Sequence, residues 1–418
     1  MRAAHAAIVV FAMCSAVLPS AWRARLEKRK YVILRFPPAN PSPVVSGLES
    51  RSIGDALPSA PDLEVATDEL TATQAMLVDA EPHRIAVPVI DFALHEPVTT
   101  LGLQVAQQSV AWGVQAVGAD ASKYDGRGIT VAVLDTGIDA AHEAFAGVED
   151  LVEADFTSEG NGDKNGHGTH CAATIFGGTV QGVRVGVAPG IKRALIGKVL
   201  DKDGRGSTTS IIEGIQWALK QGAHIISLSL GMDFPFMVEK LQAQGVPGRA
   251  AISMGLEAYR ANLDIFQTLG EFIRRRAGLF QSTLAVAATG NESQRPKFSV
   301  AAGPPAIVDS FIGVAALAQT PDGLAVARFS NRQAVISAPG VEISSAKVGG
   351  GLAAMSGTSM ATPHVAGVAA LWADRLVRAT GRFSPDALKG RLIGTATLDG
   401  FAPGHDPLDV GAGLVRSP

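Results

Sequence analysis

Residues 356–367 read Ser-Gly-Thr-Ser-Met-Ala-Thr-Pro-His-Val-Ala-Gly, and the apolar run 365–372 that begins inside this stretch predicts a buried helix. Ser359 comes at the start of that helix, where unpaired backbone N–H groups and the helix dipole favour negative charge. A hydroxyl there can attack a carbonyl carbon while its own amide holds the oxyanion. Gly357 allows a sharp bend, and Pro363 is expected in the first helical turn, where its missing N–H costs little. Gly-Thr-Ser alone is equally compatible with a helix that Ser359 only caps.

An acid and a histidine stand at element ends further upstream. The apolar run 129–134 predicts a buried parallel strand, and it stops at Asp135-Thr136-Gly137. A carboxylate at the C-terminal end of such a strand lies at the rim where α/β sheets bind ligands. After a polar loop, His167 opens a predicted helix. His170 follows it three residues later, but no glutamate lies between them as in zinc-binding helices, so we predict no metal site there.

The chain between these motifs alternates strands and helices. Residues 193–200 and 223–230 predict strands, and residues 207–221 predict the helix between them. Such alternation predicts right-handed crossovers and a parallel sheet. In the stretch 284–291 a further predicted strand ends in Gly290 and brings the amide side chain of Asn291 to the same rim.

Together these segments resemble the subtilisin-like serine peptidases, also called subtilases, whose triad follows the chain order Asp, His, Ser. The resemblance begins at Gln107-Gln108-Ser109-Val110-Ala111-Trp112, continues through the loop 337–340 and ends in the turn 409–414, covering roughly three quarters of the chain. It implies an α/β fold, a three-layer sandwich with a mainly parallel central sheet, over residues 107–418. A cysteine beside the second histidine, Cys171, matches a thiol-containing subset of the family that includes proteinase K.

The resemblance also implies roles for individual residues. Ser359 is the nucleophile, His167 the general base and Asp135 its orienting acid, while the Asn291 side chain and the Ser359 amide form the oxyanion hole. His170 is structural. Substrate lies between residues 198–206 and residues 229–231, pairing with both as a strand. The residues expected to bind substrate are Ser229, Leu230, Gly231, Ala288, Thr289, Gly290 and Gly303, the last at the rim of the first specificity pocket.

Calcium is a common cofactor of the family, but its usual high-affinity site is incomplete in this sequence. Gln108 is retained, whereas Ala144 stands at the carboxylate position and Val180 lies where an amide-bearing loop is expected. Hard cations need several oxygen ligands, so we predict no calcium at this site and leave other sites open.

The N-terminal quarter carries no chemical motif. Residues 3–22 are mostly apolar after Arg2, which predicts a secretory signal over residues 1–24 that is too short and alanine-rich for a stable membrane span. An extended or misassigned start is the alternative, in which case the protein is cytoplasmic rather than secreted. Residues 25–106 contain strand-like runs at 31–36 and 84–92 around a Pro/Ser-rich loop. By position they are expected to form a small α+β propeptide that inhibits the enzyme; an unrelated accessory domain is the alternative.

Composition excludes some classes of protein. The chain of 418 residues is 47% hydrophobic and 18% charged, with a net charge of −3. It can bury a large core, and the charge gives no reason to expect nucleic acid or an anionic membrane as partner. The two cysteines, Cys14 and Cys171, cannot form an intramolecular disulfide once the N-terminus is removed, and they do not identify the compartment.

We therefore expect a monomeric serine endopeptidase, made as a zymogen, that cleaves proteins or peptides. The open alternatives are a dedicated processing protease of narrow specificity and a pseudoprotease that only binds peptides. A lipase or esterase is excluded because no Gly-x-Ser-x-Gly precedes an Asp and a His. The segment 232–276 is enlarged, with apolar residues at helical spacing from Arg249 to Arg276, and we expect it to shape the first specificity pocket. Cys171 is expected to be a small buried residue whose reaction with bulky thiol reagents inhibits.

Overall fold

The structure is a computed structural model, and it describes residues 28–37, 63–95, 109–276 and 281–418. It divides into two compact units, residues 1–89 and residues 90–418, which we describe separately. The expected signal at 1–24 and the expected domain boundary between residues 106 and 107 lie outside the described residues, as do Gln107 and Gln108.

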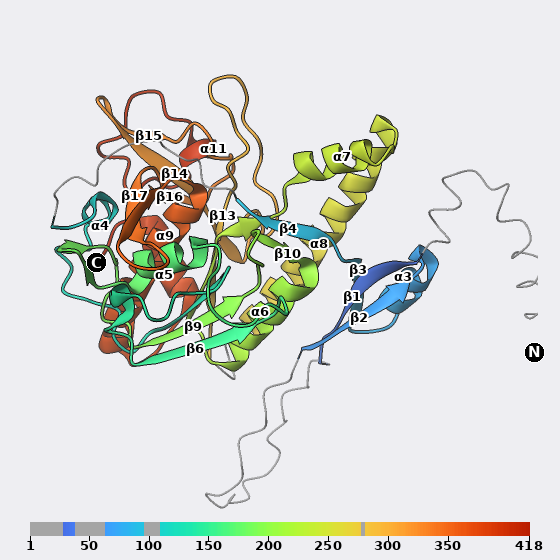
Figure 1. Cartoon of the computed structure of the whole chain (residues 1–418), viewed down its shortest axis with the longest axis horizontal. Helices are drawn as coiled ribbons and strands as arrows, with labels where there is room; N and C mark the ends of the chain where they lie inside the picture. The colour runs from blue at the N-terminus through green and yellow to red at the C-terminus, as the bar shows by residue number, and fades with distance from the viewer. Residues whose placement is uncertain (1–27, 38–62, 96–108, 277–280) are drawn as a thin grey trace, which may run out of the picture. The chain divides into compact units, whose positions relative to one another are not determined.

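Within residues 28–37 and 63–89, the first unit is a small antiparallel sheet with one helix (Figure 1). Its strands β1 (Arg29–Arg35), β2 (Glu64–Leu70) and β3 (Arg84–Pro88) are ordered β2-β1-β3. Helix α3 (Ala72–Asp79) begins with a capping box between Thr71 and Gln74, and it buries Ala75 against Tyr31, Leu70 and Ala86. The expected α+β character of this region is therefore present in the described part of the unit.

The second unit is built on one large sheet. The order of its main path is β15-β14-β13-β11-β5-β9-β6, with β16 paired to β14. Every pairing in it is parallel except that of β15 with β14, which confirms the predicted mainly parallel sheet. The strands are β5 (Thr130–Asp135), β6 (Asp150–Asp155), β9 (Arg193–Lys198), β11 (Ile225–Leu228), β13 (Leu284–Ala288), β14 (Phe311–Thr320), β15 (Gly323–Val326) and β16 (Ile336–Pro339).

Helices cover both faces of this sheet, giving the expected three layers. Figure 1 shows α5 (His167–Phe176) and α9 (Thr358–Thr380) on one side, with α6 (Thr208–Lys220) and α8 (Gly248–Arg276) on the other. The side chains of β5 alternate accordingly. Val131 and Val133 belong to the core that contains α5 and α9, whereas Leu134 contacts α6 at Gly214. No helix in the described segments is long and apolar enough to cross a bilayer.

A second, three-stranded sheet is attached to the large one. It is antiparallel, with β4 (Asp91–Leu94) between β10 (Arg205–Ser207) and β12 (Leu230–Gly231). The strand-like run at 84–92 is divided between β3 and β4, which belong to different units. Pro88 ends β3, because a proline has no N–H to continue a ladder.

The remaining elements are short or lie at the edge of the second unit. Between β12 and β13, α7 (Phe234–Ala243) precedes α8, and both occupy the segment that the sequence marked as enlarged. The others are α4 (Trp112–Ala116), η1 (Glu143–Phe145), β7 (Thr179–Val180), β8 (Val183–Arg184), β17 (Ile343–Ala346), β18 (Leu352–Met355), α10 (Pro385–Gly394) and α11 (Pro407–Val410).

Candidate active site

A carboxylate and an imidazole meet where two elements end. Asp135 is the last residue of β5 and His167 the first of α5, and Asp135 Oδ1 lies 2.7 Å from His167 Nδ1 with both side chains buried. A carboxylate only accepts hydrogen bonds, so Nδ1 carries a proton, and in the neutral form of the ring Nε2 presents a lone pair. Gly166, just before the helix, has φ 103°, a conformation that favours glycine.

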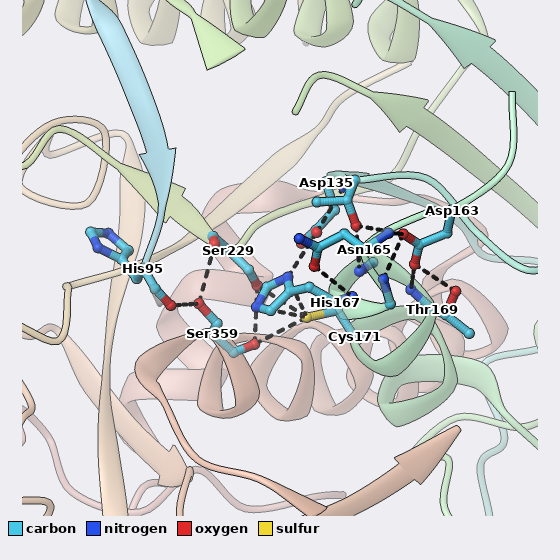
Figure 2. Close-up of polar contacts among 12 residues, drawn as sticks. His95, Asp135, Asp163, Asn165, His167, Thr169, Cys171, Ser229 and Ser359 are labelled. Carbon is cyan, nitrogen blue, oxygen red and sulfur yellow. Dashed lines mark hydrogen bonds and ion pairs between the residues drawn. The ribbon is translucent and has the colours of Figure 1, made fainter. Parts of the chain in front are cut away.

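Asp163 holds the loop before α5 in place, and sequence reasoning missed it. Its Oδ1 accepts hydrogen bonds from the backbone N–H groups of Asn165 and Gly166. Its Oδ2 accepts from the backbone N–H and the hydroxyl of Thr169. Burial by itself raises its pKa, but these hydrogen bonds lower the pKa below its usual value. A buried carboxylate thus orders the turn that places His167, as Figure 2 shows. An aspartate shortly before a helix is the only signal for it in the sequence.

The protonation of His167 depends on its acidic partner. Burial lowers the pKa of the imidazole, but the Asp135 carboxylate at 2.7 Å raises it more strongly, so that the pKa lies well above 6.5. Cys171 Sγ lies 3.7 Å from Nδ1 and 3.9 Å from Nε2. Burial raises the pKa of that thiol, which is therefore neutral at physiological pH.

Ser359 is the second residue of α9, and Figure 2 shows the His167 ring between it and Asp135. Its Oγ lies 3.2 Å from the Ser229 carbonyl oxygen and 3.4 Å from that of His95. Within the described residues no hydrogen bond joins Ser359 Oγ to His167. The hydroxyl is turned toward Ser229, and rotation about the Cα–Cβ bond is the motion that changes its partner.

The sequence predicted Pro363 in the first turn of the helix, and this prediction was wrong. The helix begins at Thr358, which makes Pro363 its sixth residue. An interior proline leaves the carbonyl four residues earlier without a helical donor. That carbonyl is the one of Ser359, and it accepts from Ser229 Oγ at 3.1 Å and Cys171 Sγ at 3.3 Å. Two donors from other elements therefore replace the one helical donor that is missing.

Asn291 reaches the same place from the end of β13. Its Oδ1 accepts from the amide and the hydroxyl of Thr358, each at 2.9 Å, which directs Nδ2 away from that helix. Nδ2 donates to the His95 carbonyl oxygen at 3.1 Å. Thr358 also binds the Gly290 amide through its hydroxyl, at 3.1 Å. The start of α9 thus sets which way the Asn291 amide points.

A segment of the chain itself lies in the predicted substrate position. Ala93 of β4 pairs with Arg205 on one side and with Gly231 on the other, and Leu94 pairs with Leu230. The next residue is His95, whose carbonyl oxygen meets Asn291 and Ser359. Phe92 is buried with its ring 5.7 Å from that of Phe266 in α8. Sequence reasoning did not single out His95, because no local pattern marks it.

The remaining expected substrate-binding residues surround this segment. Ser229 lies between β11 and β12 and contacts Ser359, while Ala288, Thr289 and Gly290 form the end of β13 and the turn before Asn291. Gly303 lines a cavity of about 260 Å³ together with Glu292 and with residues of α7 and α8, among them Phe234, Pro235, Leu256 and Tyr259. The enlarged segment and the predicted pocket rim thus line one cavity.

Among the described residues, two places have the composition or the position of a metal centre. Asp135, His167 and Cys171 place ligand-type atoms within 4.8 Å of one another, but Asp135 Oδ1 and His167 Nδ1 are hydrogen-bonded to each other. His170 does not join them, since its Nε2 contacts the Ile343 carbonyl oxygen at 2.9 Å. At the expected calcium position, Ala144 and Val180 are buried in the hydrophobic core with Phe145 and Phe176, so their side chains do not suit a cation.

Comparison with known proteins gives consistent matches. The family model described as "Subtilase family" matches residues 126–413. "Subtilisin-like protease 6" of Trichophyton schoenleinii is 33% identical over 293 residues, which cover 67% of this chain and 63% of that protein. The protein of the same name from Trichophyton rubrum is 35% identical over 286 residues, which cover 65% of this chain and 60% of that protein. "Thermostable alkaline protease" of Halalkalibacterium halodurans is 33% identical over 315 residues, which cover 74% of this chain and 73% of that protein. The chain thus spans somewhat less than two thirds of the fungal relatives.

Proposed function

The chain belongs to the subtilase family, and on this premise we propose that it is a serine endopeptidase acting through Asp135, His167 and Ser359. One observation carries the proposal. A peptide carbonyl, that of His95, receives a hydrogen bond from Asn291 Nδ2 at 3.1 Å while Ser359 Oγ lies 3.4 Å from the same oxygen. Figure 2 shows the buried His167, which is bound to Asp135, on the side of Ser359 that faces Asp135. Acyl transfer uses an acid, a histidine and a serine in this order.

In the proposed reaction Ser359 Oγ attacks the carbonyl carbon while His167 Nε2 takes its proton. Asp135 keeps Nδ1 protonated and stabilises the imidazolium that forms. Negative charge develops on the carbonyl oxygen, where Asn291 Nδ2 donates to it, and the Ser359 amide is proposed as a second donor. His167 then protonates the leaving amine. Water, deprotonated by the same imidazole, hydrolyses the acyl-enzyme.

We also propose that the N-terminal region acts as an intramolecular inhibitor. The support is β4, which pairs with strands on both sides and is followed directly by the buried His95, whose carbonyl oxygen lies 3.4 Å from Ser359 Oγ. Substrates are proposed to bind in the same extended way, through main-chain hydrogen bonds to residues 205–207 and 230–231. We further propose that the protein is secreted and monomeric, and that it holds no calcium at the position of Ala144 and Val180.

The test is labelling with a phosphonylating reagent that reacts with active-site serines. The purified full chain, after any self-processing, should be labelled once and should lose activity toward casein, and Ser359→Ala should abolish both. Ser344→Ala, in β17, serves as a matched control and should keep both. Labelling that persists in Ser359→Ala, or hydrolysis without it, would contradict the proposal. Mass spectrometry of the labelled peptide identifies the modified serine directly.

A further inference from the structure

The side chain of His95 is enclosed in a slot with an acidic wall. The residue is 5% exposed, and its Nδ1 lies 3.1 Å from Glu292 Oε1. Gly231 forms another wall, where a Cβ atom would lie 2.4 Å from His95 Nε2. Any side chain at residue 231 would therefore overlap the imidazole. The slot accepts a flat ring on the Gly231 side and offers a hydrogen-bond acceptor at the Glu292 side.

Glu292 is fixed in position by a polar network. Its Oε2 accepts from Asn331 Nδ2, and Asn331 is held in turn by contacts with Thr289 and Ser293. Burial alone raises the pKa of Glu292, but His95 and the hydrogen bonds lower that pKa to about 2. The group is a carboxylate at neutral pH, and it can only accept, so the His95 Nδ1–H is the donor.

This arrangement discriminates between side chains by charge and by hydrogen bonding. An imidazole donates to Glu292 and gains from its charge. An aliphatic or phenyl side chain leaves a partly buried carboxylate facing apolar atoms, and an acidic side chain meets a like charge. A site discriminates most strongly against a side chain that leaves one of its buried polar groups without a hydrogen-bond partner. The free-energy cost of removing that polar group from water is then not compensated.

Building on the proposed function, we propose that Glu292 determines specificity by selecting a histidine immediately before the scissile bond, and that His95–Glu96 is the bond the protein cleaves in its own chain. The His95 carbonyl oxygen already has both expected neighbours, Asn291 Nδ2 at 3.1 Å and Ser359 Oγ at 3.4 Å. The segment before it pairs as a substrate strand on both sides.

The cleavage needs water as its only co-reactant. Ser359 Oγ forms a bond to the His95 carbonyl carbon, and the C–N bond to Glu96 breaks as His167 transfers the serine proton to the Glu96 nitrogen. Water then adds to the ester and returns its proton to Ser359 by way of His167. The products are a fragment ending in the carboxylate of His95 and a chain beginning with the amine of Glu96.

Self-cleavage is tested on the full-length protein by N-terminal sequencing and intact mass. A product that begins at Glu96 is expected in the wild type and none in Ser359→Ala. His95→Gln keeps the size of the side chain but should slow the release of this product roughly tenfold to hundredfold, the range typical of one charge-assisted hydrogen bond. A first cut at another bond, including the one before residue 107, would overturn the proposal, as would an unchanged rate in His95→Gln.

Specificity is tested with peptides identical except for the residue before the scissile bond, carrying His, Gln, Phe, Leu or Asp. The processed wild type should have its highest kcat/KM with His. Glu292→Gln should reduce the His-to-Phe ratio roughly tenfold or more, since it removes the charge and keeps the shape. Glu257→Gln, an exposed residue of α8, is the control for lost charge and should keep the ratio. A preference for Phe or Leu in the wild type, or a ratio unchanged in Glu292→Gln, would overturn the proposal.

The labelling experiment separates this inference from the proposed function. A protein whose Ser359 is labelled and that cleaves other peptides, but not those with His, contradicts only the role of Glu292. A protein that is not labelled and cleaves nothing contradicts the endopeptidase itself.

Discussion

Pro363 stands four residues after Ser359 in α9, so the Ser359 carbonyl has no helical N–H to bind and accepts instead from Ser229 Oγ at 3.1 Å and Cys171 Sγ at 3.3 Å. The proline thereby exchanges one bond within the helix for two bonds to other elements. Ser229 belongs to the connection between β11 and β12, and Cys171 to the helix of His167. The backbone at the proposed nucleophile is consequently tied to its neighbours across the site.

This relationship predicts a coupling between residues 229 and 363. In a Ser359→Ala background, which prevents self-digestion, Ser229→Ala should lower the free energy of unfolding by about 1–2 kcal/mol, because a buried carbonyl loses a donor. With Pro363→Ala added, the helix supplies an N–H to that carbonyl, and the same Ser229→Ala change should cost less. Urea unfolding of the four variants measures the coupling. Equal costs in both backgrounds would show that the proline is irrelevant to Ser229.

The pH dependence of peptide hydrolysis should follow His167. The proposed base must be neutral to act, and the Asp135 carboxylate raises its pKa well above 6.5 even though burial opposes this. The value of kcat/KM should therefore fall as pH decreases through a midpoint above 6.5. Asp135→Asn should move that midpoint downward and reduce the rate about 10⁴-fold, the loss known for such a change in another serine peptidase. A rate that stays constant from pH 5 to 8 would argue against His167 as the base.

Asn291 should contribute to the rate rather than to substrate binding. Asn291→Ala should lower kcat by about 10² to 10³-fold with little change in KM, the loss known for the corresponding donor of subtilisin. Thr358→Val removes the hydroxyl bond to Asn291 Oδ1 but keeps the backbone bond, so a smaller loss is expected. Steady-state kinetics with one good peptide checks both. A loss of kcat in Thr358→Val as large as that in Asn291→Ala would contradict this expectation, because the backbone bond from Thr358 would then not be enough to orient the Asn291 side chain.

Cys171 should make the site sensitive to thiol reagents. Its sulfur contacts the His167 ring and the Ser359 carbonyl, so an attached mercurial displaces groups of the proposed triad. The raised pKa and full burial of the thiol predict slow inactivation, on a time scale set by local opening. Cys171→Ser should remain active and resist the reagent. Equal inactivation of Cys171→Ser would place the modified group elsewhere.

The α7 segment should influence which peptides are cleaved. Phe234 and Pro235 of α7 line the same cavity as Glu292 and Gly303. Deleting residues 234–247, as the enlarged segment suggested from sequence, should change the profile of cleaved peptides at the position before the scissile bond. Phe236→Ser, which alters an exposed side chain of the same helix, is the matched control. An unchanged profile after the deletion would leave α7 as a surface elaboration.

Much of the site could be predicted because its parts have local signatures. A β-branched apolar run identifies β5, and a strand of that kind places the residue after it at the sheet rim. The same reasoning placed His167 at the start of a helix and Asn291 after a strand. Pro363 shows the limit of local rules. Proline is common in a first turn, and only the outside donors Ser229 and Cys171 reveal why it is tolerated in the sixth position of α9.

The sequence by itself determined the mainly parallel sheet and the order of the motifs, because strand and helix periodicity and the residues at element ends are properties of neighbouring residues. Only the tertiary structure decided that β4 lies between β10 and β12 and that His95 meets Glu292, 197 residues away. A strand's sequence states which faces it can bury but not which edges it will pair with. That choice depends on backbone hydrogen bonds and on a pocket whose walls come together only when the chain is folded.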